Sequence, residues 1–247
     1  MIYLTSDLHG KHDELMSLLD HVGFSDRDWL WIIGDVIDRN GDGGVRTLKW
    51  LLNQPNVQLI LGNHEHFLLS NRWLFEEVSD ASLNSLSSER LSGVSLWQYN
   101  GGDVTMRSLR RELPEVREDI LGYLEDCPIY ERVSVGGRKY ILVHGGLGNF
   151  YPEKPLESYS MHELLWERPT LATRYSPEEY TVILGHTPTF TYSGAYKNRM
   201  IRTNNGWWNI DTGAASDTGR PMLLCLDTLD EYYIENGGEI IRIENWM

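Results

Sequence analysis

The feature that most restricts the fold of this 247-residue chain is an alternation of short apolar runs with amphipathic stretches. Apolar runs at 2–5, 29–33 and 57–61 predict buried strands, and segments 13–22 and 45–52 carry leucine and valine at helical spacing. This βαβαβ rhythm indicates parallel strands joined by crossover helices. Further strands are predicted at 129–135, 140–143, 181–184, 206–210 and 222–226, and alternating apolar and polar residues in the last segments favour antiparallel pairing there.

The stretch 67–125 breaks this rhythm, because it is polar and rich in serine and leucine and predicts helices joined by loops. We expect it to form a helical, cap-like insertion beside the site. No linker or repeat separates two halves, so we predict one domain over 1–247. The predicted fold is an α/β sandwich of two mixed β-sheets flanked by helices, with the helical insertion.

Charge and composition restrict the partners and the compartment. The formal net charge of −14 repels polyanions, so we expect binding neither to nucleic-acid polymers nor to membranes. A phosphate substrate remains compatible with this charge, since bound dications and a few arginines reverse the sign locally. Cys127 and Cys225 lie outside any ligand spacing, and no signal peptide or membrane-spanning run is evident, so we expect a cytoplasmic protein.

Five polar motifs stand at or near the carboxyl ends of predicted strands, the edge at which open α/β sheets bind ligands. Each motif offers the oxygen and nitrogen donors that borderline divalent metals prefer, and none offers a thiolate. One such motif is weak, because Asp and Gly are common turn residues, but five in this order indicate a metal site. The motifs are Asp7-Leu8-His9, Gly34-Asp35-Val36-Ile37-Asp38-Arg39, Gly62-Asn63-His64-Glu65, His144-Gly145-Gly146 and Gly185-His186-Thr187.

These motifs predict two metal ions. Asp7 and His9 are two residues apart where a strand gives way to a loop, so both can reach one ion. The two oxygens of Asp35 can bridge ions about 3.5–4 Å apart. The second ion would be completed by Asn63, His144 and His186. Manganese is the expected metal, with iron, zinc or cobalt as alternatives, since all suit such donors.

The order of the motifs resembles that of the calcineurin-like metallophosphoesterase superfamily. The forms Gly-Asp-Val-Ile-Asp-Arg (34–39) and Gly-Asn-His-Glu (62–65) are most similar to its phosphoprotein phosphatase branch, including the small bacterial and phage enzymes. Residues 209–214, Asn-Ile-Asp-Thr-Gly-Ala, resemble a late strand and turn of that branch. The resemblance implies two metal ions that activate a bridging water, which attacks phosphorus in line without a covalent intermediate.

The resemblance also implies roles for individual side chains. His64 would protonate the leaving oxygen, and Asp38 would orient His64 and stabilise its charge. Arg39 would bind two phosphate oxygens through its planar guanidinium group. Arg168 matches a region where relatives place another phosphate-binding arginine, and the alternative is a surface cation after a helix. Many relatives carry arginine immediately before Gly-Asn-His-Glu, whereas this chain has Leu61 there, so a phosphate-binding charge is missing or supplied elsewhere.

We therefore expect a dinuclear, metal-dependent phosphoesterase acting on phosphomonoesters, with a serine/threonine phosphoprotein as the leading substrate. The alternative is a symmetrical diadenosine-tetraphosphate hydrolase or another small-molecule phosphoesterase, because those hydrolases share the motifs. A third possibility is a binding module that has lost its chemistry. It is disfavoured because every expected ligand is present, as are His64 and Asp38.

Overall fold

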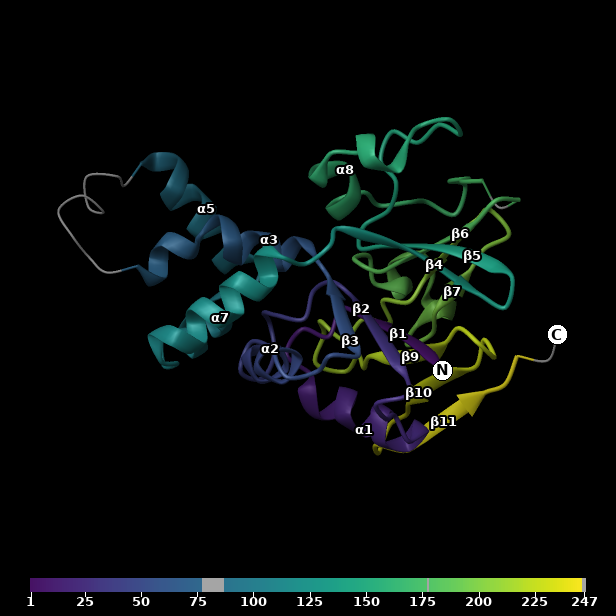
Figure 1. Cartoon of the computed structure of the whole chain (residues 1–247), viewed down its shortest axis with the longest axis horizontal. Coiled ribbons are helices and arrows are strands. Elements are labelled where there is room, and N and C mark those ends of the chain that lie inside the picture. Colours follow the sequence, from purple (N-terminus) through teal and green to yellow (C-terminus); the bar gives the residue numbers. More distant parts are fainter. Residues whose placement is uncertain (77–86, 177, 246–247) are drawn as a thin grey trace.

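Two β-sheets packed against each other form the centre of the computed structural model, which describes residues 1–76, 87–176 and 178–245 (Figure 1). The six-stranded sheet has the order β11-β10-β9-β1-β2-β3, and the five-stranded sheet has the order β4-β5-β6-β8-β7. The first sheet consists of β1 (Ile2–Ser6), β2 (Trp29–Ile33), β3 (Val57–Ile60), β9 (Met222–Cys225), β10 (Glu231–Ile234) and β11 (Ile240–Ile243). The second consists of β4 (Tyr130–Val135), β5 (Arg138–Val143), β6 (Thr181–Leu184), β7 (Ile201–Arg202) and β8 (Trp207–Asn209).

The first sheet combines a parallel half with an antiparallel half. β1, β2 and β3 pair in parallel, connected by α1 (His12–Val22) and α2 (Val45–Leu51), which confirms the predicted βαβαβ unit. β9 pairs antiparallel to β1 and leads into the β10–β11 hairpin. Strands β7, β10 and β11 were not predicted, because they lack the uninterrupted apolar runs of the central strands.

The second sheet is also mixed. The β4–β5 hairpin is antiparallel, β5, β6 and β8 are parallel, and β7 is antiparallel to β8. The expectation of antiparallel pairing for the last segments is therefore correct for β9, and for β8 it holds on the side of β7 but not on the side of β6. The connection 185–206 returns the chain to the end at which β6 begins, so β8 runs in the same direction as β6.

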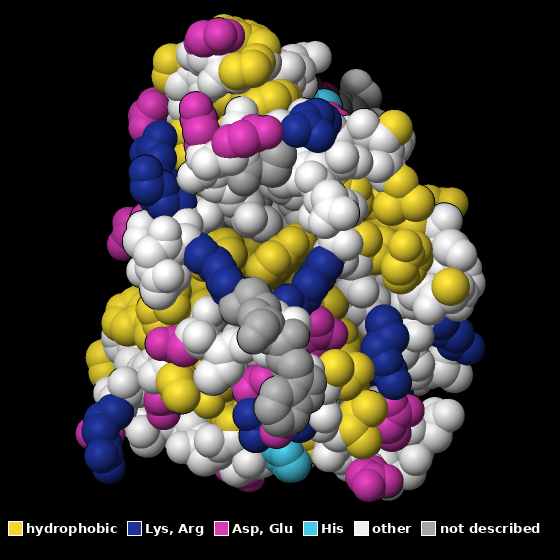
Figure 2. All heavy atoms as spheres, turned by 90° about the vertical axis from the view of Figure 1, so that its right-hand side faces the viewer, with side chains coloured by type: hydrophobic (Ala, Val, Ile, Leu, Met, Phe, Trp, Pro, Cys, Tyr) yellow, Lys and Arg dark blue, Asp and Glu magenta, His cyan; other side chains and the backbone are white. Residues whose placement is uncertain are grey.

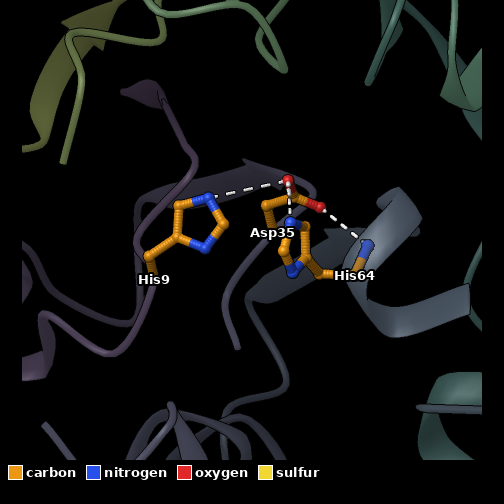
Figure 3. Close-up of side chains that lie close together, drawn as sticks. All are labelled: His9, Asp35 and His64. Atoms are coloured by element: carbon orange, nitrogen blue, oxygen red, sulfur yellow. Dashed lines mark hydrogen bonds and ion pairs between the residues drawn. The ribbon is translucent and has the colours of Figure 1, made fainter. Parts of the chain in front are cut away.

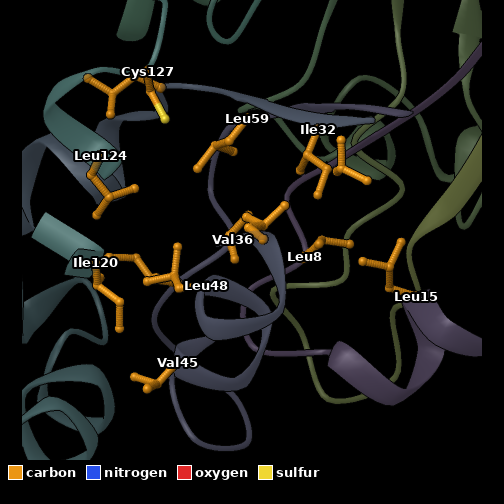
Figure 4. Packing of buried hydrophobic residues seen from close by; sticks show 14 of the residues in the cluster. Leu8, Leu15, Ile32, Val36, Val45, Leu48, Leu59, Ile120, Leu124 and Cys127 are labelled. Carbon is orange, nitrogen blue, oxygen red and sulfur yellow. The ribbon is translucent and has the colours of Figure 1, made fainter. Parts of the chain in front are cut away.

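Alternation along the strands divides the described core among three clusters, one between the two sheets and one on the outer face of each sheet. Leu4 and Ile33 of the first sheet and Leu142 and Ile183 of the second are fully buried in the layer between the sheets. Side chains on the outer face of the first sheet pack against α1, α2 and the insertion, where Leu48 is completely buried (Figure 4). Burial of one such leucine stabilises the fold by about 1.5–3 kcal/mol.

The described part of 67–125 consists of helices joined by short turns, so the fold contains a helical insertion as predicted. Residues 77–86 of that stretch lie outside the described residues. α5 and α7 extend to one side of the sandwich, and α3 joins them to β3 (Figure 1). The helices here are α3 (Asn63–Ser70), η1 (Arg72–Phe75), α5 (Ser88–Tyr99), α6 (Asp103–Leu109) and α7 (Pro114–Glu125).

Shorter helices lie between the strands of the second half of the chain. They are η2 (Leu156–Ser158), α8 (Met161–Leu165), η3 (Thr189–Thr191) and η4 (Gly194–Tyr196). Throughout the described ranges, no helix has both the length and the apolar character needed to cross a bilayer. Cys127 and Cys225 are both buried and unbridged.

Candidate metal centre

The carboxyl ends of five strands from both sheets meet at one place. Asp7, Asp35 and Asn63 follow β1, β2 and β3, and His144 and His186 follow β5 and β6. The backbone N–H of His186 donates to both carboxylate oxygens of Asp7, at 3.0 and 3.1 Å. The site therefore joins the two sheets and brings together the six predicted ligands, one of which is His9.

Asp35 lies at the centre of this cluster. Its Oδ2 is 3.7 Å from His9 Nε2 and 3.8 Å from His64 Nε2 (Figure 3), and its Oδ1 is 3.3 Å from His144 Nε2. Two buried groups could each hold a cation, with ligand atoms within 4.8 Å of one another. One group is His9, Asp35 and His64, and the other is Asp35, His144 and His186.

Backbone carbonyls orient two of the histidines. His9 Nδ1 donates to the Ile37 carbonyl at 2.9 Å, and His144 Nδ1 donates to the Ile33 carbonyl at 3.0 Å. Each bond directs the other ring nitrogen toward Asp35, as in metal-binding histidines. Within the described residues, the buried Nε2 of His186 has no hydrogen-bond partner. The donor set thus fits a divalent cation, and the unpaired nitrogen supports that fit.

Burial and charge set the protonation of the cluster. Burial lowers the pKa of His9 to about 3 and that of His186 to about 2, so both are neutral, as metal ligands must be. Burial opposes a charge on His144, but the Asp35 carboxylate raises its pKa to about 10. His144 Nε2 also lies 2.9 Å from Asn63 Oδ1. His144 therefore binds a proton in the absence of metal, and a cation that binds this histidine would have to displace that proton.

The predicted catalytic residues border the same cluster. His64 Nδ1 lies 2.6 Å from Asp38 Oδ2, and both side chains are buried. The exposed Arg39 reaches the other ring nitrogen of His64, with its guanidinium 3.5 Å from Nε2. Burial lowers the pKa of His64, but Asp35 and Asp38 outweigh this effect and raise it.

Arg168 also reaches the cluster, whereas Leu61 brings no charge to it. The Arg168 guanidinium donates to the His186 carbonyl at 3.2 Å and to the Thr187 hydroxyl at 2.9 Å, so it lies at the rim of the cluster. Leu61 is buried in the core, and its backbone N–H donates to the Pro128 carbonyl at 2.8 Å. Among the residues that the structure describes, Arg39 and Arg168 are the arginines that contact the cluster.

The backbone of the cluster is held in an unfavourable conformation. Nine non-glycine residues with positive φ occur in the described ranges, and six of them belong to the predicted site. A side chain in this region costs of order 1–3 kcal/mol, and such residues concentrate at functional sites. The six are Asp7, His9, Asp35, Asp38, Arg39 and His186.

Glu65 supports the cluster in a way that the sequence did not reveal. Its buried carboxylate accepts hydrogen bonds from the backbone N–H groups of residues 35, 36, 37 and 62, at 2.8–3.2 Å. Glu65 therefore ties the loop after β2 to the loop after β3. The available signal was a glutamate three residues after Gly62, at the start of a helix, where such a side chain caps backbone donors.

A large hollow in the described surface lies away from the cluster. It has a volume of about 1280 Å³ and is lined by parts of β4, β5 and β6 and by neighbouring loops. Figure 2 shows this side of the molecule, with Lys and Arg side chains bordering a hollow with hydrophobic side chains at its base. None of the cluster residues lines this hollow, so the candidate site is identified by the buried donor set instead.

Comparisons with known proteins identify a family for this chain. A family profile described as calcineurin-like phosphoesterase matches residues 1–212. Symmetrical bis(5'-nucleosyl)-tetraphosphatases of Salmonella typhimurium and Salmonella typhi are 44% identical over 70 residues, covering 28% of this chain and 24% of theirs. The match thus spans about a quarter of the length of these curated relatives.

One solved structure, provisionally described as a diadenosine tetraphosphatase, superposes with a TM-score of 0.58 over 99% of this chain and 93% of that chain. Its sequence identity of 20% restricts this similarity to the fold.

Proposed function

This chain belongs to the calcineurin-like phosphoesterase family, and on that premise we propose that it is a metal-dependent hydrolase of phosphate esters. The observation that supports this most is the Asp35 carboxylate, whose two oxygens face different histidine groups. A carboxylate so placed is suited to bridging two cations. In the proposal, Asp7, His9 and Asp35 hold one ion, and Asp35, Asn63, His144 and His186 hold the other.

Bound divalent ions, manganese in the first instance, would supply an activated water and neutralise phosphate charge. The protein itself would contribute proton transfer and substrate binding. His64 would protonate the leaving oxygen from Nε2, because Nδ1 is engaged by Asp38 at 2.6 Å. Arg39, 3.5 Å from that Nε2, and Arg168 at the rim would bind phosphate oxygens.

For the substrate, we propose a dinucleoside polyphosphate first. The 44% identity to symmetrical bis(5'-nucleosyl)-tetraphosphatases over 70 residues supports it. A phosphoprotein is the second candidate, supported by the forms of the motifs at 34–39 and 62–65. Leu61 weighs against it, since an uncharged residue stands where many relatives carry a phosphate-binding arginine.

The test is hydrolysis of diadenosine tetraphosphate, a serine phosphopeptide and p-nitrophenyl phosphate, each with Mn²⁺ and with chelator. We expect metal-dependent turnover, fastest with the dinucleotide, and at least about a 100-fold loss in Asp35→Asn. The exposed Asp26→Asn serves as the control and should match the wild type. Faster turnover of the phosphopeptide would reverse the order of substrates. Absence of turnover with metal bound would refute the enzymatic proposal and favour a binding module.

A further inference from the structure

We propose that Trp97 and Thr105, two residues of the helical insertion, are positioning residues that hold Asp38 in its contact with His64. This inference rests on the proposed function and deepens it at the same site. Trp97 lies in α5, Thr105 lies in α6 and Asp38 follows β2, and all three are 0% exposed. α5 contacts α3, the helix that carries His64 (Figure 1).

Both carboxylate oxygens of Asp38 accept hydrogen bonds from the insertion. Trp97 Nε1 donates to Oδ2 at 2.8 Å, the same oxygen that lies 2.6 Å from His64 Nδ1. The Thr105 hydroxyl donates to Oδ1 at 2.5 Å and accepts from the backbone N–H of Asp38 at 3.0 Å. One threonine therefore fixes the backbone and the side chain of Asp38 together.

The insertion also supports the unfavourable backbone at this point. Asp38 and Arg39 are consecutive non-glycine residues with φ of 75° and 70°. The N–H of Arg39 donates to the Gly101 carbonyl at 3.1 Å, in the turn between α5 and α6. Such a conformation persists only where its surroundings impose it, and here α5, α6 and their turn do so.

Two glycines allow this close approach. A Cβ at Gly102 would lie 2.3 Å from the Trp97 indole, and one at Gly43 would lie 2.5 Å from Thr105. Trp97 and Thr105 can thus occupy their observed positions only because Gly102 and Gly43 have no side chain. The arrangement is built around Asp38 rather than resulting from general packing of the insertion.

A defined chemical consequence follows from these contacts. Losing either donor leaves a buried carboxylate oxygen short of a partner, so Asp38 reorients and His64 loses its fixed position. A misplaced His64 slows protonation of a poor leaving group such as ethoxide. It has little effect on 4-nitrophenolate, which departs without a proton.

The experiment compares Trp97→Phe and Thr105→Val with matched variants outside the site. Trp207→Phe removes an indole that is also 0% exposed and donates to the Thr173 carbonyl at 3.0 Å. Thr47→Val removes a hydroxyl that is 0% exposed and lies 3.1 Å from His12. With Mn²⁺ present, we expect kcat for ethyl phosphate to fall roughly 10- to 100-fold in the first pair only. For p-nitrophenyl phosphate the change should stay within about 3-fold, and Thr105→Ser, which keeps the hydroxyl, should retain activity on ethyl phosphate.

A second readout is independent of turnover. ¹⁵N-histidine NMR of the metal-free protein should show the His64 Nδ1–H resonance shifted or lost in Trp97→Phe and Thr105→Val, and kept in the control variants. Equal losses on both esters, or an unchanged His64 resonance, would overturn the positioning role. If the wild type hydrolyses neither ester, the proposed function fails for these substrates, and the NMR comparison alone decides the positioning role.

Discussion

At the scale of single residues, the cluster assigns different work to chemically similar groups. Asp35 belongs to both candidate cation groups, whereas Asp38 contacts Nδ1 of the His64 ring. His9 and His144 are oriented by backbone carbonyls, and His64 is oriented by a carboxylate. A histidine held by a carboxylate is suited to proton transfer, since the partner stabilises its charged form.

His64 allows a direct test, because it also belongs to one of the two groups that could hold a cation. In His64→Asn we expect bound manganese to stay at the wild-type level, measured by elemental analysis. Turnover of ethyl phosphate should fall by roughly 100-fold or more, since proton transfer is lost. A loss of one ion per chain would instead make His64 a ligand and contradict the proton-transfer role.

Glu65 offers a second test at this scale. Because its buried carboxylate accepts four backbone N–H bonds, Glu65→Gln should lower the free energy of unfolding by about 2–4 kcal/mol. Urea denaturation of the metal-free protein measures the change. The exposed Glu89→Gln is the control and should stay within about 0.5 kcal/mol of the wild type. A similarly small change in Glu65→Gln would mean that the loops after β2 and β3 keep their conformation without the Glu65 carboxylate.

At the scale of secondary-structure elements, the insertion is joined to the sandwich by apolar packing. Leu48 of α2 lies fully buried in one cluster with Ile120 and Leu124 of α7 (Figure 4). We expect Leu48→Ala to lower the free energy of unfolding by about 2–5 kcal/mol, because it leaves a cavity. Leu91→Ala, on an exposed position of α5, is the control and should change it by less than about 0.5 kcal/mol. Equal effects, measured by chemical denaturation, would exclude this packing as a source of stability.

The short helix α8 should give a pH-dependent contribution to stability. Glu163 accepts hydrogen bonds from Lys154 and from the backbone N–H of Ser160, and these contacts lower its pKa from 4.5 to about 2. A carboxyl group with a lowered folded-state pKa stabilises the fold above its unfolded pKa. The difference in stability between wild type and Glu163→Gln should therefore be constant near neutral pH, shrink below about 4.5 and vanish near 2. A difference that persists at the acid end in urea titrations would show that the carboxylate charge is not involved.

At the scale of the whole molecule, the candidate ligands connect the two sheets. Asp7, His9, Asp35 and Asn63 follow strands of the first sheet, and His144 and His186 follow strands of the second. An ion bound to both sets would stabilise the folded state alone, by about 2.7 kcal/mol at a concentration 100-fold above its Kd. Thermal unfolding should thus shift to higher temperature on addition of Mn²⁺ and return with chelator. The shift should be absent in Asp35→Asn, and a shift that survives this substitution would place the ion elsewhere.

Much of this architecture could be predicted from the sequence because its signals are local. Uninterrupted apolar runs gave β1, β2, β3 and β6 to within a residue, and helical spacing gave α1 and α2. The strands β10 and β11 were not predicted. The segments Glu231–Ile234 and Ile240–Ile243 are strands because β10 pairs with both β9 and β11. Pairing energy of this kind depends on the partner strands, which the residues of a single short segment do not reveal.

By itself, the sequence determined which side chains end the strands, and that parallel strands would bring them to one edge. Only the tertiary structure decided how they meet. It aligned the ends of two sheets, so that His144 lies 3.3 Å from Asp35, and imposed positive φ on six site residues. It also brought Glu65 beneath the loop after β2, and Trp97 and Thr105 against Asp38. The physical reason is that motif order follows from local preference, whereas hydrogen bonds between distant segments and backbone strain exist only once the surrounding core is packed.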